Sequence, residues 1–188
     1  TEGFTTIANK IAEIAIDKAP KSAEELKNLS FNGNGQTIND RITEEIGKSG
    51  EKIELSAYYL LEAEKVVAYN HPGNKVASIV GLNKSGEKIQ EVAKDVAMQI
   101  AAMSPIAVDK NDVPKEVIDK EIEIGKEQAR TEGKPEQMLE KIALGKLTRF
   151  YKDYTLLNQD FIKDGKKTVG QYLKEAETGL TVTSFKRL

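Results

Sequence analysis

The chain has a single histidine, His71, and no cysteine, so few of its side chains could act as a base, a nucleophile or a metal ligand. Imidazole is the usual general base and pH switch near neutral pH, and only His71 could fill such a role here. His71 alone cannot build a catalytic triad or a metal shell. His71 stands directly before Pro72 and Gly73, and this turn chemistry favours an exposed residue. The lack of cysteine excludes disulfides, thiolate catalysis and sulfur-ligated zinc.

Two acidic clusters are the remaining candidates for metal binding or for an acid and base pair. They are Asp40, Glu44 and Glu45, and Asp119, Glu121 and Glu123. Lysine or arginine lies near most of these residues, and neither the calcium-loop nor the zincin spacing is present. We therefore interpret both clusters as solvated helix faces. The glycines follow neither phosphate-loop pattern, so the sequence predicts no metal, no cofactor and no nucleotide site.

The size and composition are typical of a helix-rich protein with one substantial core or two small ones. Of the 188 residues, 31% are charged and 39% hydrophobic, and the formal net charge is -2. Because the two signs are interspersed, the chain lacks the basic field that binds nucleic acid backbones. No apolar run reaches the roughly 18 residues of a membrane span, and the first residues are unlike a secretory signal. We expect a cytoplasmic protein without direct nucleic acid or membrane contact.

The first fifty residues have the apolar spacing of helices. Apolar residues recur every three or four positions over 4–17, and Pro20 ends this pattern. Ser22 and Glu25 form a capping-box pattern that starts a short second helix. A third helix is predicted over 37–48, with Gly50 beyond its end. Helices should therefore position the first acidic cluster.

The apolar period then changes to that of strands. Alternation from Ile53 to Leu61 predicts a half-covered strand, and 66–69 and 76–80 predict a hairpin whose turn carries His71. Helical spacing returns over 87–103. A capping-box pattern at Thr168 predicts a helix to about Glu175, and 180–185 reads as a final strand. The chain should therefore belong to the α+β class.

Residues 114–150 carry the pattern of an antiparallel helical hairpin. After Pro114, apolar or small residues recur at the four-three-four spacing of a coiled-coil seam; these are Ile118, Ile122, Gly125 and Ala129. Gly133 and Pro135 turn the chain. The facing stripe is Leu139, Ile142, Ala143 and Leu147. At a rise of roughly 1.5 Å per residue, such a hairpin would project about 25 Å.

Three stretches of the sequence resemble one known family, elongation factor Ts. The stretch from Leu156 to Glu175 joins a short strand-like apolar piece to a capped helix and is similar to that family. The block Gly50-Glu51-Lys52-Ile53-Glu54-Leu55 resembles its middle region, and Tyr69-Asn70-His71 follows at the family's spacing. The order and separation also agree, and the resemblance covers nearly the whole chain.

The resemblance implies an exchange factor that performs no covalent chemistry. Members of the family bind elongation factor Tu carrying GDP and accelerate release of the nucleotide by deforming its site. Gly50 and His71 match partner-contact positions, and Ser49 stands where a branched aliphatic residue is usual. The paired arginines often found after the block are replaced by Ser56 and Ala57. The family's core can dimerise, so a homodimer is a second expectation.

The resemblance also implies a division of the chain. We expect two related subdomains, each an antiparallel sheet covered by helices: an incomplete one over 1–63 and a second over 64–113 and 151–188, with a coiled-coil insertion at 114–150. The family's amino-terminal domain and its Thr-Asp-Phe-Val signature would lie before Thr1, and its terminal helix after Leu188. A core of this kind could bind its partner weakly or fail to exchange. The length of the hairpin favours the bacterial form.

Two other classes of function stay open from the sequence. A structural or adaptor module would associate with itself through a sheet edge and the hairpin, and it would have no affinity for a GTPase. A hydrolytic or metal-dependent enzyme is the third class, and a single histidine without cysteine argues against it.

Overall fold

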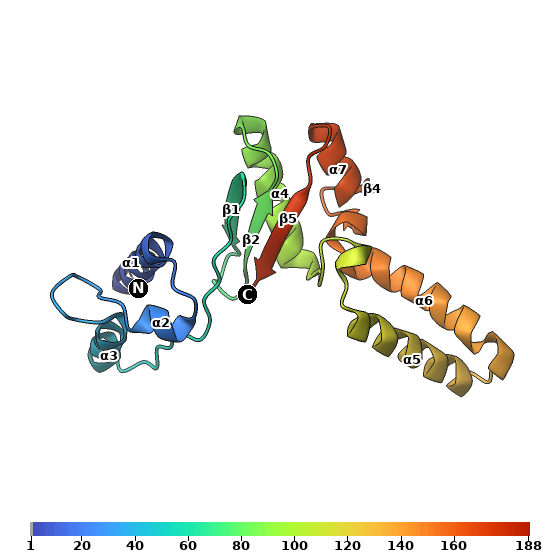
Figure 1. The fold of residues 1–188 in the computed structure, drawn as a ribbon, viewed down its shortest axis with the longest axis horizontal. Helices are drawn as coiled ribbons and strands as arrows, with labels where there is room; N and C mark the ends of the chain where they lie inside the picture. The colour runs from blue at the N-terminus through green and yellow to red at the C-terminus, as the bar shows by residue number, and fades with distance from the viewer. Residues whose placement is uncertain (1) are drawn as a thin grey trace. The chain divides into compact units, whose positions relative to one another are not determined.

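The computed structural model describes residues 2–188, which divide into two compact units, 2–60 and 61–188. Thr1 lies outside the described residues. Figure 1 shows the order of the elements along the chain. Helices combine with small antiparallel sheets, which confirms the predicted α+β class. None of the helices in residues 2–188 combines the length and the apolar character that a membrane span requires.

The first unit is built from three helices around one small core. The helices are α1 (Glu2–Lys18), α2 (Ala23–Lys27) and α3 (Ile38–Ser49), as the apolar spacing predicts. Their shared core consists of Ile7, Ala15, Leu26, Phe31, Ile38 and Ile42. The hydroxyl of Ser22 accepts a hydrogen bond from the backbone of Glu25 at 3.0 Å, as expected for a cap of α2.

The strand predicted from Ile53 to Leu61 does not form, and this prediction was wrong. Within the described residues of the first unit, the only β feature is an isolated bridge between Ser30 and Thr37. A strand requires a neighbour that accepts and donates backbone hydrogen bonds, and no described segment pairs with residues 53–61. Ile53, Leu55 and Tyr58 instead pack against the helical core. The expected sheet of the first subdomain is therefore not seen in residues 2–60.

The second unit centres on a three-stranded antiparallel sheet with the order β1-β2-β5. The strands are β1 (Lys65–Asn70), β2 (Ala77–Leu82) and β5 (Val182–Arg187), so the predicted hairpin and final strand are confirmed. Val80 of β2 lies opposite Val67 and Phe185 of its two neighbours. These residues share one face, because side chains alternate along a strand.

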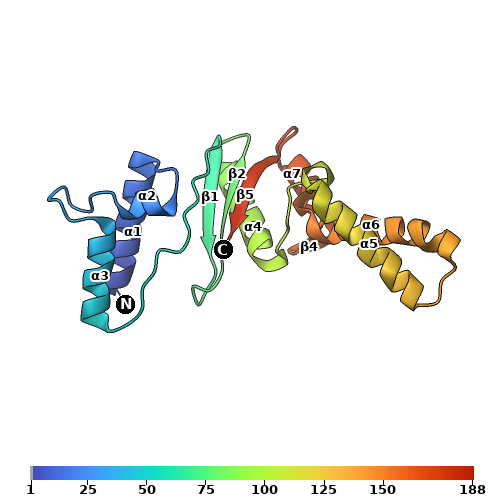
Figure 2. The same ribbon diagram turned by 60° about the horizontal axis from the view of Figure 1, so that its bottom comes forward.

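Helix α4 (Glu87–Met103) covers that face of the sheet, as Figures 1 and 2 show. Val92, Val96 and Ile100 recur at helical spacing and are buried against the strands. The hydroxyl of Ser78 in β2 donates to the carbonyl of Ala97 at 2.6 Å, which ties the sheet to the helix.

Helices α5 (Lys115–Thr131) and α6 (Leu139–Tyr154) form a hairpin that leaves the rest of the second unit, with short 3-10 turns at Lys110–Asp112 and Glu136–Met138. We call residues 115–154 the arm. The two helices lie side by side, with Gly125 of α5 against Ala143 of α6. The ammonium group of Lys146 in α6 donates to the side chain of Gln128 in α5 at 2.8 Å.

The chain returns from the arm through the stretch Leu156–Glu175. A 3-10 turn at Leu156–Asn158 leads into the small sheet of β3 (Asp160–Phe161) and β4 (Asp164–Thr168), so the strand-like piece is mostly a turn. Helix α7 (Val169–Ala176) follows, and its predicted capping box at Thr168 is present with Gln171. Phe161 stacks on Tyr172 of α7 with ring centroids 4.1 Å apart.

Candidate partner-binding site

Ser49 and Gly50 lie at the exposed carboxyl end of α3. Gly50 adopts the left-handed conformation, with φ 70°, and its N–H donates to the carbonyl of Ile46 at 2.9 Å. A side chain strains this conformation, so glycine is the natural residue for ending the helix here. The hydroxyl of Ser49 donates to the carbonyl of Glu45 at 2.9 Å and accepts from the N–H of Glu51 at 3.2 Å. The end of α3 is thus an ordered, exposed corner.

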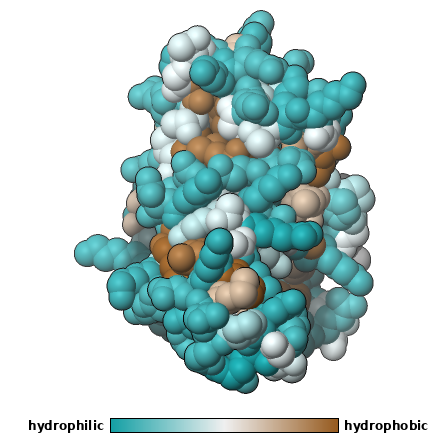
Figure 3. Space-filling model, turned by 90° about the vertical axis from the view of Figure 1, so that its right-hand side faces the viewer, coloured by the Kyte–Doolittle hydropathy of each residue, from teal (hydrophilic) through white to brown (hydrophobic). Residues whose placement is uncertain are grey.

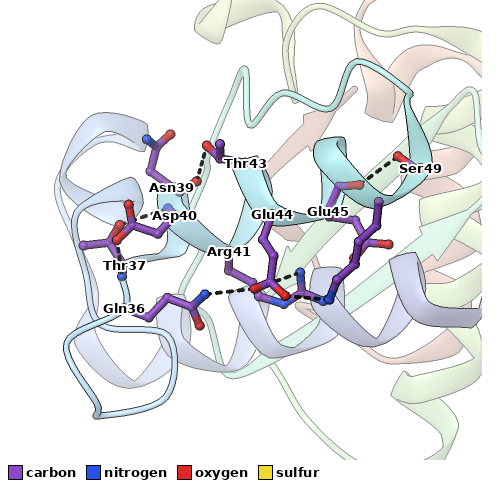
Figure 4. Close-up of polar contacts among 10 residues, drawn as sticks. Gln36, Thr37, Asn39, Asp40, Arg41, Thr43, Glu44, Glu45 and Ser49 are labelled. Atoms are coloured by element: carbon purple, nitrogen blue, oxygen red, sulfur yellow. Dashed lines mark hydrogen bonds and ion pairs between the residues drawn. The ribbon is translucent and has the colours of Figure 1, made fainter.

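The start of α3 is fixed by a capping box. The N–H of Asp40 donates to the hydroxyl of Thr37 at 3.0 Å, and the N–H of Thr37 donates to the Asp40 carboxylate at 2.9 Å (Figure 4). The hydrogen bond from the backbone N–H of Thr37 lowers the pKa of Asp40 below its ordinary value. The first member of the acidic cluster, Asp40, therefore completes the capping box of α3.

The other two members, Glu44 and Glu45, lie along α3 beside basic side chains, as Figure 4 shows. Lys48 donates to Glu44, which also accepts a hydrogen bond from the amide of Gln36 at 3.0 Å. These two donors lower the pKa of Glu44. The guanidinium of Arg41 is 3.1 Å from the carboxylate of Glu45. Each carboxylate has a partner on this helix or beside it, as the interpretation of a solvated polar face requires.

His71 occupies the exposed turn between β1 and β2 in the second unit. Its ring nitrogen Nδ1 is 3.0 Å from the hydroxyl of Tyr69, and this hydrogen bond orients the imidazole. The backbone of His71 donates to Val76 and accepts from Asn74, both at 2.9 Å. Asn74 has a positive φ of 53°, which suits a tight turn. The imidazole is therefore presented to solvent on a defined turn.

The second acidic cluster lies on the arm. The carboxylate of Asp119 is 3.0 Å from Lys115, and that of Glu123 is 3.4 Å from Lys126, on the same helix. Throughout residues 2–188, no group of three or more histidine, cysteine or acidic side chains is arranged to hold a metal ion. The cluster behaves as a charged helix surface.

The surface seen from the side of the arm is mostly hydrophilic, with separate hydrophobic patches (Figure 3). Several large apolar side chains of the second unit are at least 39% exposed; on or beside the arm they are Ile106, Ile124, Met138, Leu144 and Tyr154. Phe150 lies close to Tyr154, with ring centroids 4.9 Å apart. Single exposed apolar side chains are common on protein surfaces, so they do not by themselves mark a binding site.

The three residues that the sequence assigns to partner contact, Ser49, Gly50 and His71, are all exposed. Ser49 and Gly50 belong to the first unit, and His71 belongs to the second.

Sequence reasoning missed the hydrogen bonds that Gln99 and Gln159 make at the base of the arm. A polar residue inside the apolar stripe of α4, between Val96 and Ile100, was the available signal for the first of them.

Comparison with known proteins gives a consistent result over the whole chain. The family model for elongation factor Ts matches residues 1–188. An elongation factor Ts of Amoebophilus asiaticus is 50% identical over 186 residues, and one of Cytophaga hutchinsonii is 48% identical over 186 residues. Both alignments cover 98% of this chain and 66% of the relative. The chain therefore spans just under two thirds of the length of these curated relatives.

Proposed function

Because this chain belongs to the elongation factor Ts family, we propose that it acts in translation elongation as a guanine nucleotide exchange factor for elongation factor Tu. The family match over residues 1–188 carries this proposal. The activity requires docking surfaces and a preference for one state of the partner, and it involves no covalent chemistry. We also propose a cytoplasmic location, because translation takes place there.

The energetic requirement on such a factor is differential binding. A ligand shifts an equilibrium only by the difference in its affinity for the two states, so the chain must bind nucleotide-free partner more tightly than GDP-bound partner. Each tenfold preference corresponds to about 1.4 kcal/mol. A preference of about a thousandfold therefore needs about 4 kcal/mol of contacts made only in the nucleotide-free complex.

We assign Ser49, Gly50 and His71 to the contact with the partner. The exposed corner at the end of α3 and the exposed turn after β1 support the assignment, because both present a fixed backbone to solvent. The hydrogen bond between Tyr69 and His71 reduces the freedom of the imidazole before binding. Such preorganisation lowers the entropy lost on association.

We further propose that residues 114–150 are a coiled-coil insertion of a second subdomain, formed by 64–113 and 151–188, and that residues 1–63 belong to the first. The close approach of Gly125 to Ala143 supports the seam, and the exposed apolar side chains of the arm, together with the family match, support a contact with a protein. The insertion would extend the binding surface of the factor.

Release of a fluorescent GDP analogue from elongation factor Tu tests this function. The assay compares the chain, its His71→Ala variant and a Lys75→Ala control in the same exposed turn. Faster release with the chain and with Lys75→Ala, but slower release with His71→Ala, supports both the activity and the assigned contact. Binding without release would confine this chain to docking. No binding at high concentration contradicts the proposal.

A second candidate is a self-associating structural module, because the order β1-β2-β5 leaves β1 and β5 at the edges of the sheet. An edge strand offers unpaired backbone groups to a second copy. This candidate predicts a molecular mass that rises with concentration and no affinity for the GTPase. A homodimer that also accelerates GDP release would instead fit the exchange factor.

A further inference from the structure

Two glutamine side chains are fully buried where the arm joins the rest of the second unit. Gln99 of α4 is 0% exposed, and Gln159, which follows the arm, is 1% exposed. Burial of an amide is unfavourable unless its donors and acceptor are satisfied. Each of these side chains both donates and accepts hydrogen bonds, so their partners define what the pair holds together.

The amide nitrogen of Gln159 connects the ends of two helices. It donates to the carbonyl of Met103, the last residue of α4, at 3.3 Å and to the carbonyl of Asp153 near the end of α6 at 2.9 Å. Carbonyls in the last turn of a helix have no partner within that helix. One side chain therefore satisfies a terminal carbonyl of α4 and one of α6, and so fixes one helix end against the other.

Gln99 completes the connection from within α4. Its amide nitrogen donates to the side-chain oxygen of Gln159 at 3.2 Å and to the carbonyl of Asp160 at 3.1 Å. Its oxygen accepts from the N–H of Ile162 at 2.9 Å. The pair thus binds α4 to the segment that leaves the arm.

The segments that enter and leave the arm are also joined by their backbones. The N–H of Ile106 donates to Tyr154, and the N–H of Leu156 donates to Ala107, both at 2.9 Å. Ala107 and Thr155 form a parallel bridge. The side chain of Asn158 donates to the carboxylate of Asp109 at 2.7 Å. Both ends of the arm are therefore held at one place.

We infer that Gln99 and Gln159 are positioning residues that set the direction of the arm relative to α4 and the sheet. This role rests on the proposed function, in which the arm contacts the partner. A small change of angle where the arm joins α4 would displace the far end of the arm, so that contact requires a fixed angle. An apolar pair could fill the same volume, but its contacts are not directional. Hydrogen bonds to specific carbonyls allow a single orientation.

The distance between two spin labels measures this direction in the full 188-residue chain. The chain has no cysteine, so Lys94→Cys in α4 and Lys141→Cys in α6, both exposed, provide the only labelling sites. We expect a narrow distance distribution for the chain itself. Gln159→Met, which is similar in shape but donates nothing, should broaden or shift it. Gln137→Met, the same change at the exposed end of the arm, should leave it unchanged.

An unchanged distribution in a folded Gln159→Met variant overturns the inference. Hydrogen exchange in the unaltered chain gives a second test that does not depend on that variant folding. The N–H of Ile162, which donates to the side chain of Gln99, should exchange as slowly as the N–H groups of β2. Exchange as fast as at the exposed turn of the arm would equally overturn it. Neither measurement includes the GTPase, so failure of the exchange activity would be recognised separately.

Discussion

The close approach of α5 and α6 at Gly125 gives the sharpest prediction for the arm. A Cβ atom at this position would lie 3.1 Å from the Cα and 3.2 Å from the Cβ of Ala143, which is fully buried. These distances are shorter than ordinary van der Waals contact between carbon atoms. The methyl group of alanine would therefore push the two helices apart.

The magnitude follows from two opposing contributions. Alanine favours a helix interior over glycine by about 1 kcal/mol. Overpacking a well-filled contact costs about 1 to 3 kcal/mol. Gly145, in the interior of α6, has no heavy atom within 4 Å of the same added Cβ, so Gly145→Ala receives only the first contribution. The two variants should differ by about 1 to 3 kcal/mol in the free energy of unfolding, with Gly125→Ala the less stable.

Urea unfolding and hydrogen exchange measure this difference. Exchange of the α5 and α6 amides reports on the arm itself, even if the arm opens before the rest of the chain. A difference of 1 kcal/mol should shift the midpoint of thermal unfolding by roughly 2 to 4 °C. If Gly125→Ala is as stable as Gly145→Ala, the helices do not meet at this position and the seam of the arm is wrongly placed.

Three further predictions concern the end of α3, its cap and α7. Gly50→Ala should cost about 1 kcal/mol of stability by urea unfolding, because φ is 70° and no neighbour within 4 Å adds a clash. The pKa of Asp40, measured by NMR, should lie below 3.8. The contribution of its carboxylate to folding stability is therefore complete above pH 3.8 and is lost as the pH falls through the lowered pKa. A pKa at or above 3.8 contradicts the capping box. Tyr172→Phe removes a 2.7 Å hydrogen bond to Asp95 and should lower the free energy of unfolding by about 1 to 2 kcal/mol. Burial, aided by this hydrogen bond, raises the pKa of Tyr172. In an alkaline titration Tyr172 should therefore ionise after the exposed tyrosines.

Local signals in the sequence were enough to predict most helices and one hairpin. The caps at Ser22 and Thr168 and the turn at His71 depend only on residues within a few positions of each other. Such signals act without the rest of the fold. The period of apolar residues likewise fixes which face of α4 meets the sheet.

The wrong strand at 53–61 shows where local signals stop. Alternation of apolar residues states which side of a segment is buried, but strand formation also needs a hydrogen-bonded neighbour. Ile53 and Leu55 are partly buried, as the alternation requires, yet they pack against helices. For the candidate site, the sequence predicts that His71 is exposed and that Gly50 lies beyond the end of a helix, and the family match supplies their proposed role. The hydrogen bonds that orient them follow only from the structure.

The positioning role of Gln99 and Gln159 cannot be predicted from apolar spacing, because that spacing predicts apolar residues at buried positions. Buried amides are unfavourable unless they are hydrogen-bonded, so their partners show what they hold together. Here the bonded groups are the terminal carbonyl of α4, a carbonyl near the end of α6 and the backbone after the arm. In the proposed function the chain acts by contact, which depends on the angles at which its surfaces are held. The polar residues that break the apolar pattern are therefore the ones we expect to control those angles.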